Sequence, residues 1–265
     1  MIPKKIHYIW FGDKDFGPKE KYCMATWSKM LPEYEIIRWD NSNIDFFDNP
    51  YFNEAIEAKQ YAFASDYARL KVLEEYGGIY LDTDEEILKP LDVFLDHDFF
   101  LGCQSCGSAK GLNPALVGAI PHHPIVKDLL AVYDHIHFIN EDGSYNRTSN
   151  PAYFYQVLKE KYNIPTGYLK KGRIEFYPKA FLYDYFYFGK KNRTSYATHH
   201  YAGNWKPDWK IENKFKFHWQ GKTYQLRKYK KNHENVEMAM ENGETIVFKL
   251  KTSKKSYFVI VRTKE

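Results

Sequence analysis

Short apolar runs alternate with longer stretches of helical periodicity over the first 140 residues of the chain. Runs rich in β-branched and aromatic residues predict strands, and apolar positions at helical spacing predict helices. The predicted strands are 5–11, 35–39, 79–81, 98–102 and 115–119, and the predicted helices are 19–30, 53–75 and 124–138. This alternation predicts an α/β sandwich around a mostly parallel sheet.

The third predicted strand is followed by the most informative polar residues. Gly77 and Gly78 end the preceding helix, and Asp82 and Asp84 come directly after the strand. Carboxylates two residues apart on a strand share one face, and where the chain leaves the sheet they can converge on one ligand. In open α/β sheets, ligands bind at such strand ends.

The pattern changes from residue 211 onward, where short alternating runs are separated by Gly- and Lys-rich turns. Runs at 214–219, 245–250 and 257–261 predict a small antiparallel β-rich appendage. A chain of 265 residues suits one main domain. We therefore expect a catalytic domain over residues 1–210 and this appendage over residues 211–265.

Charge is divided unevenly between the two parts of the chain. Residues 206–265 contain 15 Lys and Arg against 7 Asp and Glu, a net charge of +8, whereas residues 1–205 contain 23 against 27, a net charge of −4. The appendage could bind an anionic membrane face or a polyanionic partner. A solvated basic surface fits the same composition.

Aromatic residues make up 18% of the chain, which is more than a core alone requires. Surplus aromatic rings often stack on planar or sugar-like ligands. No stretch approaches the roughly 20 apolar residues of a membrane span, and the charged start lacks an apolar signal region. We expect a cytoplasmic protein, with peripheral contact to the inner face of the membrane through the basic region as an open alternative.

The carboxylates of Asp82 and Asp84 are hard oxygen ligands that suit Mg²⁺ or Mn²⁺, and such an ion can neutralise a departing diphosphate. The Asp-x-Asp pair alone is a weak signal, because acidic pairs also cap helices and fill turns. Upstream, Asp66 and Arg69 are three residues apart and share one helix face. They form either an ordinary helical ion pair or a clamp for a polyhydroxylated ligand.

Four ordered motifs together resemble glycosyltransferase family 32, which includes bacterial capsular and exopolysaccharide sugar transferases. The family is similar to the catalytic domain of the large clostridial glucosylating toxins. The motifs are Lys5–Trp10, Ser65–Arg69, Gly77–Asp84 and His200–Trp205. The resemblance implies a GT-A type, Rossmann-like nucleotide-sugar-binding fold, a divalent cation, and transfer with retention of anomeric configuration.

The resemblance also implies roles for individual residues. Trp10 matches the aromatic residue that stacks on the nucleobase, although a core Trp at a strand end has the same appearance. Asp66 and Arg69 match the pair that grips the donor sugar and ribose region. The remaining matches are Tyr80, an aromatic residue packed near the nucleotide, Asp82, which faces ribose and metal, and Asp84, the direct metal ligand.

The late segment His200–Pro207 resembles the His-x-x-Gly-x-x-Lys-Pro element of the retaining transferases of family 8. This resemblance implies that His200 is the third metal ligand, although His199 could exchange roles with it. Imidazole is a normal ligand for Mn²⁺ and a less usual one for Mg²⁺, so manganese is the favoured cofactor. The same segment implies that Lys206 contacts the diphosphate and that Asn204 and Trp205 contact the leaving group.

Two further asparagines are candidates for substrate binding. Asn113 resembles the Asn-containing strand start that faces the donor sugar. Asn150 lies between Ser149 and Pro151, where family members commonly have Thr-Gly-Pro. Because Asn replaces the glycine, the donor or acceptor hydroxyl that this loop reads stays open.

Together these features predict a retaining, metal-dependent transfer of a hexose, glucose or galactose, from a UDP-sugar to a glycan or lipid-linked glycan acceptor in surface polysaccharide biosynthesis. We expect no nucleic-acid partner. The alternatives are a toxin-like protein O-glycosyltransferase, a phosphohydrolase of the haloacid dehalogenase type, and a non-catalytic sugar-nucleotide-binding protein. The dehalogenase pattern places its aspartates after an N-terminal strand, whereas here they lie beyond residue 80.

Overall fold

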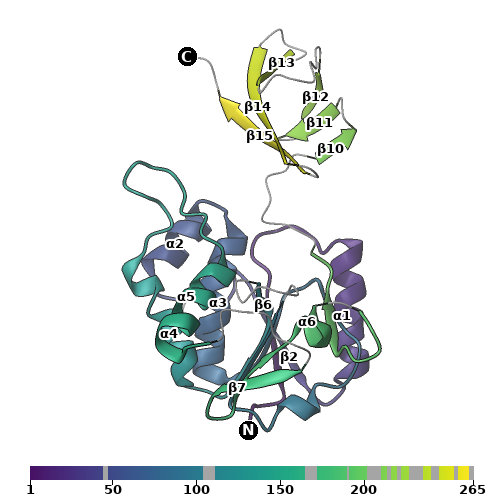
Figure 1. The fold of residues 1–265 in the computed structure, drawn as a ribbon, viewed down its shortest axis with the longest axis vertical. Coiled ribbons are helices and arrows are strands. Elements are labelled where there is room, and N and C mark those ends of the chain that lie inside the picture. The colour runs from purple at the N-terminus through teal and green to yellow at the C-terminus, as the bar shows by residue number, and fades with distance from the viewer. Residues whose placement is uncertain are drawn as a thin grey trace. The chain divides into compact units, whose positions relative to one another are not determined.

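The computed structural model describes residues 1–43, 47–103, 111–164, 172–189 and 191–201, and the backbone of six strands between residues 210 and 262. The chain divides into two compact units, Met1–Trp205 and Lys206–Glu265 (Figure 1). No helix within the described ranges is both long and apolar enough to cross a membrane.

A seven-stranded sheet forms the centre of the first unit, with the strand order β2-β1-β3-β6-β5-β8-β7. Its strands are β1 (Lys5–Ile9), β2 (Glu35–Trp39), β3 (Gly78–Leu81), β5 (Phe99–Cys103), β6 (Leu112–Ala119), β7 (Arg173–Tyr177) and β8 (Ala180–Tyr183). Strand β6 is antiparallel to both neighbours and β7 is antiparallel to β8. The other five strands share one direction, so the predicted α/β class with a mostly parallel sheet is confirmed.

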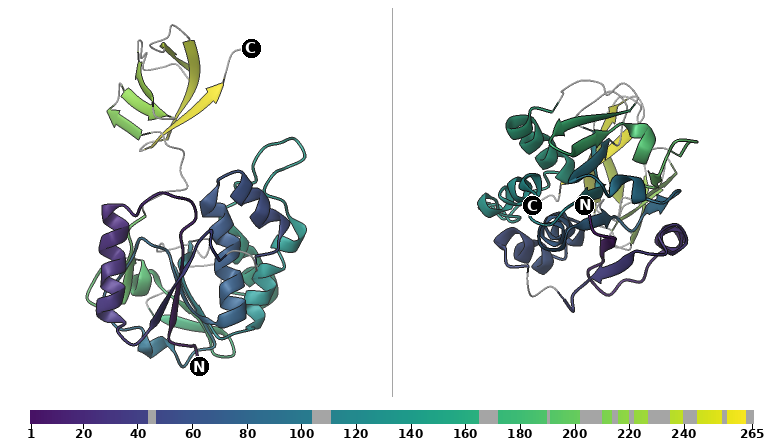
Figure 2. Two further views of the ribbon diagram at one scale, coloured as in Figure 1. Left: turned by 180° about the vertical axis from the view of Figure 1, so that it is seen from behind. Right: turned by 90° about the horizontal axis from the view of Figure 1, so that it is seen from below.

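Helices cover both faces of this sheet (Figures 1 and 2). On one face lie α2 (Pro50–Glu57), α3 (Tyr61–Tyr76), α4 (Pro124–Leu130) and α5 (Asn150–Tyr162), and on the other lie α1 (Pro18–Met30) and α6 (Tyr185–Phe188). Successive strand residues point to opposite faces, so Tyr80 packs in the cluster with α3 while Ile79 and Leu81 pack in the cluster with Trp27 of α1. The sheet is therefore buried on both sides.

Two predicted helices are shorter than expected. The helix predicted over residues 53–75 is two helices, α2 and α3, because the chain turns between them at Lys59, whose φ is +54°. The helix predicted over residues 124–138 ends at Leu130 and is followed by a 3₁₀ turn, Tyr133–His135. Another 3₁₀ turn spans Asp92–Phe94. Apolar spacing alone did not reveal either interruption.

The turn from α3 into β3 places the start of β3 next to β1. Gly77 and Gly78 have φ angles of +59° and +107°, which L side chains rarely adopt. A Cβ at Gly78 would lie 2.8 Å from the carbonyl oxygen of Lys5. The buried His7 ring secures this junction: its Nδ1 accepts a hydrogen bond from Trp39 Nε1 (3.1 Å), so its Nε2 donates to the Gly77 carbonyl (2.8 Å).

A separate two-stranded ladder lies beyond the end of β3. Strand β4 (Glu85–Ile87) pairs antiparallel with β9 (Ala197–His199), and the register sets Glu85 opposite His199. Helix α1 supports the ladder, because Trp27 Nε1 donates to the Glu85 carbonyl oxygen (2.7 Å). The ladder brings residues more than 110 positions apart in the chain to the same strand end.

The second unit contains an antiparallel meander with the strand order β10-β11-β12-β13-β14-β15. The strands are Lys210–Asn213, Lys216–Trp219, Lys222–Leu226, Asn235–Ala239, Thr245–Ser253 and Ser256–Arg262. The three runs predicted in this region correspond to β11, β14 and β15. The expected β-rich C-terminal part is thus present.

Candidate active site

Asp82, Asp84 and His199 form the central cluster of the candidate site. Strand β3 ends at Leu81, and the Glu85 amide donates to the Asp82 carbonyl (3.0 Å), so the chain turns at the two aspartates. That turn brings both carboxylates to one side. One ligand atom from each of the three residues lies within 4.8 Å of the others, and His199 Nε2 is 3.2 Å from Asp84 Oδ1.

The electrostatics of this cluster favour a cation. Burial alone would lower the pKa of His199, but its hydrogen bond with Asp84 and the negative charges of Glu85, Asp84 and Asp82 raise that pKa to about 9. Two carboxylates and an imidazole are donors that Mn²⁺ accepts. The residues present therefore fit a divalent cation.

His200, the third ligand that the sequence favoured, lies outside this cluster. Its Nε2 is 2.8 Å from Glu86 Oε2, and Glu86 also accepts hydrogen bonds from Lys191 Nζ (2.7 Å) and the Tyr22 hydroxyl (3.0 Å). Adjacent residues at the end of a strand point to opposite sides, so His199 faces Asp84 when His200 faces Glu86. The alternative assignment, with His199 as the ligand, matches the geometry.

Asp66 and Arg69 lie next to the cluster and contact Asp82. Arg69 Nη2 is 2.8 Å from Asp66 Oδ1, and its Nη1 is 3.4 Å from Asp82 Oδ1 and donates to the Pro114 carbonyl (3.0 Å). The guanidinium lies 4.6 Å above the Tyr80 ring, and the Tyr80 hydroxyl donates to Asp82 Oδ1 (2.7 Å). The fork of Arg69 therefore fixes both carboxylates relative to the strand ends.

Burial dominates the electrostatics of Asp66. Desolvation raises the pKa of its carboxyl to about 7, although the charge of Arg69 opposes this shift. Because Arg69 holds a positive charge beside it, an ionised Asp66 can accept a hydrogen bond from a hydroxyl.

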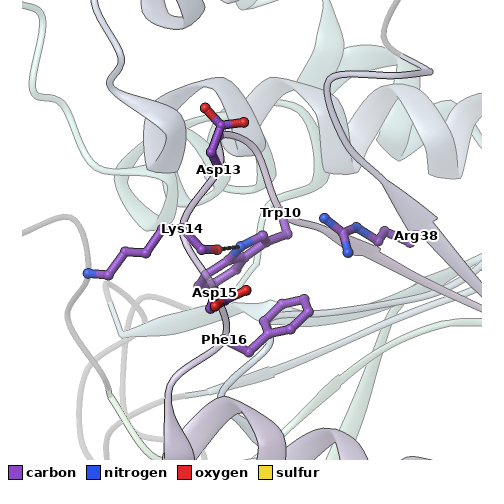
Figure 3. A pocket seen from close by; sticks show the side chains of 7 residues that line it. Trp10, Asp13, Lys14, Asp15, Phe16 and Arg38 are labelled. Carbon is purple, nitrogen blue, oxygen red and sulfur yellow. Dashed lines mark hydrogen bonds between the residues drawn. The ribbon is translucent and has the colours of Figure 1, made fainter.

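Trp10 lies at the carboxyl end of β1 and lines a cavity of about 270 Å³ (Figure 3). Its indole Nε1 donates to the Lys14 carbonyl (2.6 Å), and its ring centroid is 4.6 Å from that of Phe16. The Arg38 guanidinium lies 5.5 Å from the Phe16 ring. Two aromatic rings and a cation at one opening suit a planar heterocycle.

Asn113 and Asn150, the two asparagines that we expect to contact substrate, are buried and bond to protein groups. Asn113 is 1% exposed, and its Nδ2 donates to Glu85 Oε1 (3.3 Å). Asn150 is 4% exposed, and its Nδ2 lies 3.2 Å from both the Asp66 carbonyl and the Tyr133 hydroxyl. Asn113 therefore contacts Glu85, and Asn150 contacts the backbone of Asp66. Asn204, Trp205 and Lys206 lie outside the described residues.

Sequence reasoning missed three residues around the cluster. Glu85 is fully buried opposite His199, and Glu86 holds His200. The Tyr201 ring centroid lies 4.2 Å from that of His199, on a backbone with φ of +48°. The acidic run Asp84-Glu85-Glu86 is visible in the sequence. Its contacts with the two histidines depend on the β4–β9 pairing, which joins segments that are distant in the chain.

Comparison with known protein families places a match within the first unit. Residues 17–101 match a family described as "Glycosyltransferase sugar-binding region containing DXD motif". The matched segment contains Asp66, Arg69, Asp82 and Asp84, and it ends before His199.

Curated relatives carry names of the same kind. An uncharacterised glycosyltransferase, L373, of Acanthamoeba polyphaga mimivirus is 34% identical over 47% of this chain and 53% of its own length. The mannosyl phosphorylinositol ceramide synthase SUR1 of Saccharomyces cerevisiae is 28% identical over 51% of this chain and 35% of its own length. The chain thus spans about a third to a half of the length of these relatives.

Among solved structures, the PaToxG glycosyltransferase is similar with a TM-score of 0.46 and 23% identity, over 60% of this chain and 70% of that one. The matched sugar-binding region and the named relatives support a glycosyltransferase family for the first unit.

Proposed function

We propose that residues 1–205 form the catalytic unit of a metal-dependent glycosyltransferase of GT-A type that uses a nucleoside-diphosphate sugar. The observation that carries this proposal is the cluster of Asp82, Asp84 and His199 beside Asp66 and Arg69, within and next to the matched sugar-binding region. A metal-binding carboxylate pair and a sugar-binding carboxylate thus meet at one strand end.

Asp82, Asp84 and His199 would hold the divalent cation. When bound, a cation supplies electrostatic stabilisation for the diphosphate as it leaves. Mn²⁺ is the favoured ion because the set includes an imidazole. We also propose, from the sequence resemblance alone, that Lys206 contacts the diphosphate and that Asn204 and Trp205 contact the leaving group.

The donor would extend from Trp10 to Asp66. The cavity between Trp10, Phe16 and Arg38 would take the nucleobase. Asp66 would bond to hydroxyls of the sugar, held in place by the Arg69 fork. Tyr80 and Arg69 hold the Asp82 carboxylate in place, and Asp82 would contact both the ribose and the cation.

Retention of anomeric configuration follows if the acceptor hydroxyl attacks from the face that the diphosphate leaves. The departing phosphate oxygen then takes the acceptor proton, and no strong enzymic base is needed. Ion placement and orientation of the two substrates supply the rate enhancement.

The donor is a hexose nucleotide. UDP-glucose and UDP-galactose remain the favoured donors, and GDP-mannose joins them because the yeast relative is named for transfer of a mannosyl group. A lipid-linked glycan or glycolipid acceptor gains support from the same name, which specifies a ceramide product. A protein hydroxyl is the alternative acceptor.

A donor screen tests this function. The full-length protein with Mn²⁺ is incubated with UDP-glucose, UDP-galactose, UDP-N-acetylglucosamine and GDP-mannose, and released nucleoside diphosphate and free sugar are measured. We expect release from one donor well above the others. Release of nucleoside monophosphate and sugar 1-phosphate without free sugar would instead indicate a phosphohydrolase that cleaves the diphosphate.

A further inference from the structure

Glu85 faces the side of the His199 ring that points away from Asp84. The β4–β9 register sets Glu85 and His199 directly opposite each other. His199 Nε2 is 3.2 Å from Asp84 Oδ1, whereas its Nδ1 is 3.7 Å from Glu85 Oε1. The imidazole therefore lies between two carboxylates: Asp84, which belongs to the candidate metal cluster, and Glu85, which does not.

Two polar atoms at this contact lack a hydrogen-bond partner within the described part of the chain. They are His199 Nδ1 and Glu85 Oε2, and both are inaccessible to solvent. An unpaired buried polar group costs about 1–3 kcal/mol. Because Nδ1 is only 3.7 Å from Oε1, a small movement of the ring would give Nδ1 a hydrogen-bond acceptor.

The protein holds Glu85 firmly in this position. Its side chain is 0% exposed, its Oε1 accepts a hydrogen bond from Asn113 Nδ2 (3.3 Å), and its carbonyl accepts one from Trp27 Nε1 (2.7 Å). Glu85 is also absent from the ligand group of Asp82, Asp84 and His199 in the described residues. Its side-chain contact with the ligand group in these residues is the one it makes with His199.

We propose that Glu85 is a positioning residue that accepts a hydrogen bond from His199 Nδ1–H and thereby presents Nε2 as an unprotonated ligand to the divalent cation. Asn113 orients the Glu85 carboxylate for this task. When a carboxylate accepts a hydrogen bond from the ring nitrogen that does not bind the metal, it fixes the tautomer and orientation of the imidazole. It also makes the other nitrogen a stronger metal ligand. The inference rests on the metal site of the proposed function.

Mn²⁺ affinity of the full-length protein, measured without donor or acceptor by the EPR signal of free Mn²⁺, tests this role. Glu85→Gln should weaken Mn²⁺ binding by about 10-fold to 100-fold, the usual cost of losing such a partner. The matched control is Glu86→Gln, which removes the neighbouring carboxylate on the other side of the strand and should weaken binding by less than about threefold.

A double-mutant cycle with His199→Ala distinguishes an effect of Glu85 that acts through His199 from a general effect of removing the Glu85 charge. In the His199→Ala background, Glu85→Gln should change Mn²⁺ affinity by less than about twofold. An equal loss in both backgrounds would overturn the proposal, and so would unchanged affinity of Glu85→Gln in the otherwise native protein. Circular dichroism establishes that each variant is folded.

Asn113→Ala provides a second variant should Glu85→Gln not fold. It should weaken Mn²⁺ binding by about threefold to tenfold and have no further effect once His199 is replaced. Pulsed EPR of bound Mn²⁺ should detect an imidazole nitrogen in the native protein, and its absence would overturn the proposal. Mn²⁺ binding without sugar transfer would count against the proposed function alone.

Discussion

His199 and His200 are neighbours in sequence but bond to different carboxylates, Asp84 and Glu86 respectively. We expect His199→Ala to weaken Mn²⁺ binding at least about tenfold, because a direct ligand contributes no less than its supporting partners. His200→Ala is the matched control and should stay within about twofold of the native affinity. Isothermal titration calorimetry with MnCl₂ measures both, and a larger loss for His200→Ala would reverse the assignment.

The sequence could predict the two aspartates, but not which histidine joins them. Asp82 and Asp84 follow a local apolar strand, and local patterns reveal strand ends. The choice between His199 and His200 depends on the register of β9 against β4. A shift of one residue in that register would exchange the two rings. Because the same pairing is nonlocal, the sequence also did not reveal that Glu85 lies next to His199.

At the scale of elements, the turn between α3 and β3 determines the position of β3 and therefore of the two aspartates that follow it. Gly78→Ala should destabilise the protein by about 3 kcal/mol or more, because φ of +107° disfavours a side chain and the new Cβ would lie 2.8 Å from the Lys5 carbonyl oxygen. Gly143→Ala is the matched control: φ is +78° there and nothing lies within 4 Å of the new Cβ. Urea unfolding compares them, and equal losses would contradict the steric account.

His7 secures the same junction and should make it sensitive to acid. Burial lowers the pKa of His7 to about 4, against about 6.5 in the unfolded chain. Between these values the unfolded state binds more protons, so the contribution of His7 to stability is complete above pH 6.5 and is lost as pH falls towards 4.

The difference in unfolding free energy between the native protein and His7→Gln should therefore shrink by about 2 kcal/mol from pH 7 to pH 5. Urea unfolding of both proteins at each pH measures it. Taking the difference removes the contributions of other titrating groups, and a pH-independent difference would show that His7 is readily protonated in the folded state.

Most long elements of the first unit follow from sequence pattern, whereas the short ones do not. Strands β1, β2 and β3 and helix α1 lie within two residues of the bounds that the apolar pattern predicted. Strands β4 and β9 have three residues each, too few to establish a period. Strand β4 packs against α1 and β9 against α6, and sequence alone does not display these contacts.

At the scale of the whole molecule, the basic region is the part that we propose to contact a membrane. Residues 206–265 carry a net charge of +8. The full-length protein should therefore sediment with liposomes containing phosphatidylserine, and at about 0.5 M salt this binding should largely disappear because screening is then strong. Neutral phosphatidylcholine liposomes are the control, and equal binding of a chain ending at residue 205 would exclude this role.

The central claim is that the Asp82, Asp84 and His199 cluster performs metal-dependent sugar transfer. The most direct test is nucleoside diphosphate release from the preferred donor by the native protein and by Asp84→Asn, each with Mn²⁺ and with excess EDTA. The account predicts that EDTA abolishes release by the native protein and that Asp84→Asn loses at least about 100-fold in kcat/KM, or about 2.7 kcal/mol of transition-state stabilisation. Release that persists in EDTA, or an Asp84→Asn variant as active as the native protein, would contradict it.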